Sequence, residues 1–176
     1  YGDSPFNNEL ISEYVYMNFI NTADRYLNIT TPYLIVDNEM VTSLVLAAKS
    51  GVDVRIMTPH VPDKWYVHLI TQSYYHTLIK YGVRIFEYTP GFIHSKTMVS
   101  DDIQCIVGTI NLDFRSLYHH FECGVFMYET TAVAQVKNDF LDTQIHCQEI
   151  TAEDCKNVPL TKRFLRGLLR FFAPLM

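Results

Sequence analysis

One stretch of the sequence decides the fold: GFIHSKTMVSDDIQCIVGTINLDFRS, from Gly91 to Ser116. Residues 94–100 and 104–108 are rich in apolar and β-branched side chains, which favours two strands. The pair Asp101-Asp102 between them is typical of a tight turn. The stretch therefore predicts a β-hairpin.

Upstream of the hairpin, helical and strand patterns alternate. Apolar spacing and turn residues predict helices over 7–25, 38–49 and 63–81, and strands over 26–31, 52–57 and 83–88. Asp37 can cap the second helix, and Gly51 and Gly82 can end the second and the third. This order with short links predicts a mixed or parallel sheet flanked by helices, which is an α/β fold.

Downstream we expect a further strand over 121–128 and helices over 130–146 and 152–157. We expect residues 1–158 to form one domain and residues 159–176 a basic amphipathic helix. That helix has two interpretations. It lies on a membrane surface, with arginines at anionic headgroups and apolar side chains inserted, or it packs on its own domain or on a missing one.

The charge distribution argues against nucleic acid as a partner. The formal net charge is −5, but residues 160–176 hold four basic and no acidic side chains. The rest of the chain therefore carries 10 basic and 19 acidic side chains. Nonspecific binding to nucleic acid depends on neutralising phosphates with cations, so this acidic body should be a poor nonspecific binder. The sequence also has no carboxylate cluster with metal-ligand spacing, so we expect no metal.

Four polar residues of the hairpin form a candidate phosphate site. His94 and Lys96 are two apart along the expected strand, so their side chains should leave the same face. Lysine offers a compact cation with three donors to a phosphate held between them. Thr109 and Asn111 follow the second strand, where pairing would bring them close and add neutral donors. Gly108 would let the backbone approach closely.

Two acidic residues complete the candidate set. Glu122 comes on the following strand. A carboxylate that accepts from one ring nitrogen of His94 would fix its tautomer and free the other nitrogen to attack phosphorus. Strict alternation puts Asp101 on the face opposite Lys96. We therefore expect Asp101 to brace the turn or to pair with a cation and not to touch substrate.

The spacing His94-x-Lys96-x4-Asp101-x6-Gly108-Thr109 resembles the HxKxxxxD-x6-G-[S/T] signature of the phospholipase D superfamily. Asn111 and Glu122 stand where that family has asparagine and often glutamate, and Thr109 stands where serine is commoner. The resemblance implies an α-β-α sandwich around a mixed sheet. It implies catalytic roles for His94, Lys96, Asp101 and Glu122, and phosphate binding by Lys96, Thr109 and Asn111.

Longer segments narrow the resemblance to the C-terminal half of a bacterial cardiolipin synthase. They are TPYLIVD (Thr31–Asp37), GVDVRIMTP (Gly51–Pro59), YGVRIFEYTPGFIHSKTMVSDD (Tyr81–Asp102) and GTINLDFRSLYHHFE (Gly108–Glu122), with YGDSP at the start and FFAPLM at the end. That family carries the HxKxxxxD signature, called the HKD motif, twice. This chain holds it once. We interpret the chain as the second catalytic half of a longer enzyme.

The resemblance implies a two-step phosphatidyl transfer without a cofactor. One histidine attacks a phosphatidylglycerol and releases glycerol, which leaves a phosphatidyl-histidine. A second histidine handles the protons while another phosphatidylglycerol attacks to give cardiolipin. The expected partners are phosphatidylglycerol, an anionic membrane surface, and either the N-terminal half of the parent or a second copy of this chain. The parent is expected at the cytoplasmic face of the cell membrane, and the fragment itself in solution.

Two other interpretations stay open. The chain could be a homodimeric phosphodiesterase of the same superfamily, such as a nuclease, although its acidic body argues against DNA. It could also be a non-catalytic half for membrane binding or assembly, although the complete His-Lys-Asn-Glu set argues against that. The sequence does not decide which of the two histidines attacks phosphorus.

Overall fold

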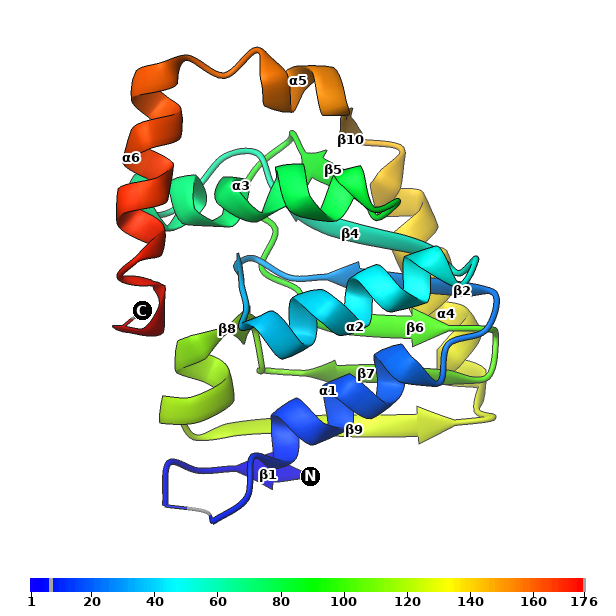
Figure 1. Ribbon diagram of the computed structural model, residues 1–176. Coiled ribbons are helices and arrows are strands. Elements are labelled where there is room, and N and C mark those ends of the chain that lie inside the picture. The colour runs from blue at the N-terminus through cyan, green and yellow to red at the C-terminus, as the bar shows by residue number, and fades with distance from the viewer. Residues whose placement is uncertain (7, 176) are drawn as a thin grey trace.

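The computed structural model describes residues 1–6 and 8–175 and shows a mixed sheet of eight strands (Figure 1). Within the sheet, β2, β4 and β5 run parallel, and the other pairings of the described strands are antiparallel. The expected mixed sheet is confirmed. In spatial order the strands are β1 (Gly2–Asp3), β9 (Glu122–Tyr128), β7 (Gln104–Gly108), β6 (Thr97–Ser100), β2 (Tyr26–Thr30), β4 (Asp53–Pro59), β5 (Arg84–Tyr88) and β10 (Cys147–Ile150).

Helices cover both faces of this sheet (Figure 1). Three helices pack on one face over the larger core, in which Phe19 and Leu44 are fully buried. On the other face, a small cluster that includes Val99 and Val133 joins the sheet to a single helix. The fold is therefore the α-β-α sandwich of the α/β class that the resemblance implies. The three helices are α1 (Ile11–Asn21), α2 (Asn38–Lys49) and α3 (Trp65–Lys80), and the single helix is α4 (Thr131–Gln144).

The ends of α2 and α3 follow the expected signals. The Asp37 carboxylate accepts a hydrogen bond from the backbone N–H of Met40 at 2.8 Å and so caps α2. Gly51 and Gly82 follow α2 and α3 with φ of +101° and +100°. Glycine adopts this left-handed backbone without the steric cost that a Cβ would bring, so it ends each helix.

Two helices begin later than the pattern predicts. α3 starts at Trp65, and the carboxylate of Asp63 accepts from the Tyr33 hydroxyl, 2.6 Å away, instead of capping the helix. α1 starts at Ile11. Asn7, where the apolar pattern placed the beginning of that helix, lies outside the described residues.

Sequence patterns missed four short strands. β1 and β10 form the two edges of the large sheet, and β3 (Leu34–Ile35) pairs in parallel with β8 (Leu112–Asp113). Three of them have two residues each, too few to show alternation, and β10 has the sequence CQEI, which carries little apolar signal. A turn of π-helix, Arg115–His119, follows β8, and the expected short helix forms as α5 (Ala152–Lys156).

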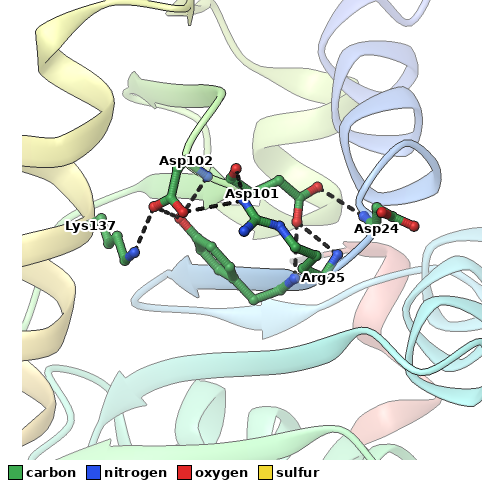
Figure 2. A network of polar contacts seen from close by, with 6 residues as sticks. Asp24, Arg25, Asp101, Asp102 and Lys137 are labelled. Carbon is green, nitrogen blue, oxygen red and sulfur yellow. Dashed lines mark hydrogen bonds and ion pairs between the residues drawn. The ribbon is translucent and has the colours of Figure 1, made fainter.

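β6 and β7 form the expected hairpin, and one carboxylate holds its turn. Asp101 and Asp102 have φ of +58° and +64°, as the two central residues of a type I′ turn do. The Asp101 carboxylate accepts hydrogen bonds from the backbone N–H groups of Asp24, Arg25 and Tyr26, at 2.8, 2.8 and 3.0 Å (Figure 2). It therefore ties the turn to the start of β2, which is the strand that pairs with β6.

The C-terminal segment forms α6 (Leu160–Arg170) and a short 3₁₀ turn over Ala173–Leu175. α6 lies against α3 (Figure 1), and Ala173 is buried in the larger core. The segment therefore packs on its own domain, which was one of the two expectations for it. Within residues 1–6 and 8–175, no helix combines the length and the apolar character that crossing a bilayer requires. The large apolar side chains that this segment exposes to solvent include Leu160, Phe164, Leu168 and Phe171.

We predict that Asp101→Ala lowers the free energy of unfolding by about 2–4 kcal/mol, because it leaves three backbone donors without their acceptor. Urea unfolding followed by circular dichroism measures this. Asp102→Asn is the matched control: Asp102 bonds Lys137 at 2.6 Å (Figure 2), but its side chain is 48% exposed. The control should cost less than about 1 kcal/mol. Equal losses in the two variants would show that Asp101 does not hold the turn.

Candidate active site

A pocket of about 580 Å³ opens at the end of the hairpin opposite the Asp101 turn. It lies where β6 begins and β7 ends, beside the start of β9. Five of the six residues singled out in the sequence line it: His94, Lys96, Thr109, Asn111 and Glu122. The antiparallel pairing of β6, β7 and β9 brings them together from three segments of the chain.

His94 and Lys96 lie side by side, although not for the expected reason. Both precede β6, which begins at Thr97, so strand alternation does not place them. The Lys96 ammonium donates to the His94 carbonyl oxygen at 2.6 Å and to the His94 ring nitrogen Nδ1 at 3.0 Å. The ring itself packs against Phe92, with centroids 5.5 Å apart. A lysine bridge and an aromatic neighbour therefore hold the imidazole.

This contact fixes the tautomer of a neutral His94. A lysine ammonium has only donors, so Nδ1 must accept and the ring proton must sit on Nε2. An imidazole in this form has no lone pair on Nε2 with which to attack phosphorus. It becomes a general acid through Nε2 once Nδ1 has gained a proton. It becomes a nucleophile through Nε2 only when Nδ1 carries a proton and Nε2 has lost its own. Lys96 therefore has to leave Nδ1 before His94 can act.

The electrostatics of the pair favour an uncharged ring. Burial, followed by the positive charge of Lys96, lowers the pKa of His94 below its ordinary value. Lys96 is 8% exposed, and this burial lowers the pKa of its ammonium group. The charges of Glu122 and Asp113 act in the opposite direction. Among the described residues, neither side chain has a hydrogen-bonded carboxylate, so the Lys96 ammonium is available to an anionic ligand.

Glu122 contacts Thr109 and not His94. The Thr109 hydroxyl donates to Glu122 Oε2, and Glu122 Oε1 lies 3.8 Å from Nδ1 of His120. The same hydroxyl accepts from the backbone N–H of Cys123 at 3.0 Å. Thr109 and Glu122 meet because β7 and β9 are neighbours. The expected bond from His94 to Glu122 is therefore absent from the described residues, and the Thr109 proton that we expected at a phosphate is used on Glu122.

Asn111 uses part of its amide on the neighbouring turn. Its Nδ2 donates to the Ser116 hydroxyl at 2.9 Å, and its Oδ1 is buried without a hydrogen-bond partner in the described structure. The backbone N–H of Ser116 donates to buried Asp113 at 2.7 Å, and burial raises the pKa of Asp113. An amide nitrogen carries two donors, so one remains for a ligand in the pocket. Ser116 and Asp113 were not singled out in the sequence.

Gly108 is required by close packing. A Cβ at this position would lie 2.5 Å from the carbonyl oxygen of Cys123 and 2.8 Å from the Cα of Gly124. Distances this short do not occur for real side chains, so any other residue would push β9 away from β7. The expected close approach of backbone at Gly108 is present, and it is made by the strand that carries Glu122.

Asp101 braces the turn, as strand alternation predicted, and lies away from the pocket. The motif resemblance grouped it with the catalytic residues, but it lies at the far end of β6 and does not line the pocket. Asp101 is 6% exposed, and its carboxylate accepts hydrogen bonds from the backbone N–H groups at the start of β2. Its place follows from strand geometry, because four strand residues separate it from Lys96.

A second cavity of about 350 Å³ shows what the sequence patterns overlooked. Its lining includes Lys64, Arg115, His120 and Tyr33. His120 links the two cavities, because its ring also approaches Glu122. The pair His119-His120 offered a signal, but neither histidine belongs to a motif with fixed spacing.

Known proteins are similar to this chain in sequence or in fold. A family model described as "Cardiolipin synthase, PLD-like domain" matches residues 16–143. A cardiolipin synthase of Geobacillus sp. is 36% identical over 166 residues, which make up 94% of this chain and 33% of that protein. The phosphatidylserine synthase structure of Haemophilus influenzae aligns with a TM-score of 0.70 and 20% identity, over 98% of this chain and 44% of that one. Nuc of Salmonella typhimurium, a phospholipase D family member, aligns with a TM-score of 0.68 and 16% identity, over 79% of this chain and 90% of that one.

The two kinds of likeness carry different weight. The structural alignments, at 20% and 16% identity, show a common fold. The family model covers most of the chain and shows common descent. The chain spans about a third of the length of the curated cardiolipin synthases that it matches.

We predict that Lys96→Met raises the pKa of His94 toward its ordinary value of roughly 6.5, because a neighbouring positive charge is removed. NMR titration of the histidine ring signals measures this. Lys137→Met, at the distant turn, is the control and should leave the His94 signal where it is in the wild type. An unchanged His94 pKa in Lys96→Met would contradict the contact between ammonium and imidazole.

Proposed function

The chain belongs to the cardiolipin synthase family of phospholipase D-like domains, and from that membership we propose that it is one catalytic half of a phosphatidyltransferase. The proposed reaction condenses two phosphatidylglycerols to cardiolipin and glycerol. The observation that carries the proposal is the pocket in which His94, Lys96, Asn111 and Glu122 converge. This set offers one imidazole, one cation and one carboxamide to a phosphodiester.

The proposed reaction has two displacements. In the first, a histidine nitrogen forms a bond to phosphorus and the glycerol oxygen leaves, taking a proton from the second histidine. In the second, that histidine takes the proton from a hydroxyl of another phosphatidylglycerol. The oxygen attacks phosphorus and the phosphorus–nitrogen bond breaks. Covalent catalysis replaces one difficult step by two easier ones, and His94 supplies one of the two imidazoles.

Lys96 has two positions in this proposal. Without substrate its ammonium bonds Nδ1 of His94. A bound phosphodiester carries a full negative charge and competes for the ammonium, and charge-assisted bonds to phosphate are the stronger ones. Transfer of Lys96 to the phosphate frees Nδ1 to take up a proton and raises the basicity of His94. Substrate binding therefore prepares the histidine for its chemical role.

The remaining polar groups stabilise the developing charge and hold the frame. The free N–H of Asn111 and the ammonium of Lys96 face the phosphate oxygens, where preorganised donors lower the barrier. Thr109 holds Glu122 through its hydroxyl. Glu122 in turn offers a carboxylate to a protonated imidazole once Lys96 has moved. In this proposal, side chains of this chain therefore provide both the donors to the phosphate and the carboxylate for the imidazole.

The site needs a second histidine from outside this chain, and an apolar wall beside the pocket suits the donor. Val107 lines the pocket, and Val125 pairs with it on β9 and is 59% exposed. Phe121 precedes Glu122 and is 71% exposed. Water-exposed apolar surface of this kind favours a protein contact. We assign it to an N-terminal half like that of the related cardiolipin synthases, which are about three times as long as this chain.

A membrane contact is proposed for the outer side of α6. Leu160, Phe164, Leu168 and Phe171 recur at helical spacing and are exposed. An apolar stripe on a surface helix binds at the boundary of headgroups and acyl chains. This arrangement revises the expectation for the tail: its apolar side chains face outward, whereas Arg166 and Arg170 turn toward the domain.

We predict that the isolated chain forms little or no cardiolipin from phosphatidylglycerol and that co-expression with an N-terminal half restores the reaction. In the restored enzyme, His94→Ala should lower turnover by at least about 10²–10⁴-fold, because a proton carrier or nucleophile is lost. Thin-layer chromatography of labelled lipid gives the readout. His146→Ala, at an exposed histidine far from the pocket, is the control.

Two results would decide against this assignment. Robust cardiolipin formation by a dimer of the chain alone would mean that two copies build the site. Turnover of a chromogenic phosphodiester without any transfer between lipids would favour the homodimeric phosphodiesterase.

We predict that Phe164→Ser with Phe171→Ser weakens co-sedimentation with phosphatidylglycerol vesicles by at least about tenfold, because two large apolar side chains no longer enter the bilayer. Leu46→Ser, at an exposed position on α2, is the control. Equal binding by the double variant and the wild type would remove α6 from the membrane contact.

A further inference from the structure

The inner side of α6 gathers arginines around a cavity that is separate from the catalytic pocket. Arg163, Arg166 and Arg170 recur at spacings of three and four, so they share one side of the helix. They line a cavity of about 220 Å³ between α6 and α3, which has room for several water-sized groups. The α3 wall supplies Gln72, Ser73 and His76, and the cavity shares no residue with the catalytic pocket.

These arginines have no acidic partner among the described residues. Arg166 Nη2 donates to Gln72 Oε1, and its Nε is buried without a hydrogen-bond partner. Arg170 lies over the ring of Tyr74, 4.1 Å from its centroid. Salt bridges form at several places in the described structure, but none of them includes an arginine of α6. Burial lowers the pKa of Arg166, while Cys155, Tyr75 and Glu87 act in the opposite direction.

The buried acid whose charge acts on Arg166 is already hydrogen-bonded to other side chains. Glu87 on β5 is 2% exposed and accepts from His60 at 2.7 Å, Tyr75 at 3.1 Å and Gln72 at 3.2 Å. It lies behind Gln72 and does not line the cavity. Among the described residues, the cavity wall therefore carries three guanidinium groups, a histidine ring and no carboxylate.

We propose that this cavity, the α6 arginine site, binds a phosphate group at a second location on the domain. A guanidinium presents its N–H donors in a planar fork that matches two phosphate oxygens, and the unpartnered Nε of Arg166 supplies one of these donors. The phosphate belongs either to a lipid headgroup or to a small soluble phosphoester, since both offer the same oxygens. Because no residue is shared with the catalytic pocket, the inference stands independently of the proposed reaction.

The test follows the α6 arginine site through the signal of His76 and the catalytic pocket through the signal of His94. Glycerol 3-phosphate is titrated into the protein while the ring signals of His76 and His94 are followed by NMR. We expect saturable shifts of His76. Arg166→Gln and Arg163→Gln should each weaken the binding seen at His76 by about tenfold or more, the loss expected for one charge-assisted hydrogen bond. The response of His94 should stay unchanged in both variants.

Lys162→Gln is the matched control, because it removes one positive charge from α6 at a residue outside the cavity lining. A parallel titration uses vesicles of phosphatidylglycerol, with phosphatidylcholine vesicles for comparison. Response to glycerol 3-phosphate supports a soluble phosphoester. Response to phosphatidylglycerol vesicles alone, reduced in Arg166→Gln and retained in Lys162→Gln, supports a lipid headgroup. The inference is overturned if His76 responds to neither probe, or if Arg166→Gln and Lys162→Gln behave alike.

Discussion

The Asp101 carboxylate is the constraint on which the arrangement of the sheet depends. It takes three consecutive backbone N–H groups at the start of β2 while it occupies a left-handed position in the turn between β6 and β7. These bonds set the register of β2 against β6, and the turn sets the register of β6 against β7. The residues at the opposite end of the hairpin follow from that register. Asp101 is thus remote from the pocket, yet it determines which side chains meet there.

The hairpin, the helices and the site residues could be predicted because each leaves a local signal. Asp37 and the two helix-ending glycines act within a few residues of themselves, and the His94 motif has fixed spacing. The contacts inside the pocket could not be predicted, because they depend on which atoms cross between strands. Thr109 reaches Glu122 only after β7 and β9 have paired, and the Lys96 bond to His94 arises in a segment that is not a strand. An edge strand such as β10 is defined by its pairing with the neighbouring strand, because its own residues carry little strand pattern.

The pocket is incomplete in a specific sense. Its cation, carboxamide and carboxylate surround one imidazole, and that imidazole is held in a form that cannot react through its open nitrogen. In the proposed reaction, the imidazole would keep this form until a substrate anion draws the lysine away. The same bond between Lys96 and His94 that organises the empty pocket would therefore also delay chemistry until the phosphate is in place.

The docking of α6 has a thermodynamic consequence. Four of its large apolar side chains face solvent, whereas its contact with the domain combines Leu169 and buried Ala173 with a guanidinium–amide bond and a cation over a ring. Burial of apolar surface is the main source of the heat capacity change of unfolding. Separating this segment from the domain should therefore expose apolar surface and raise the heat capacity, and its cost in free energy should respond to salt because guanidinium contacts are lost as well.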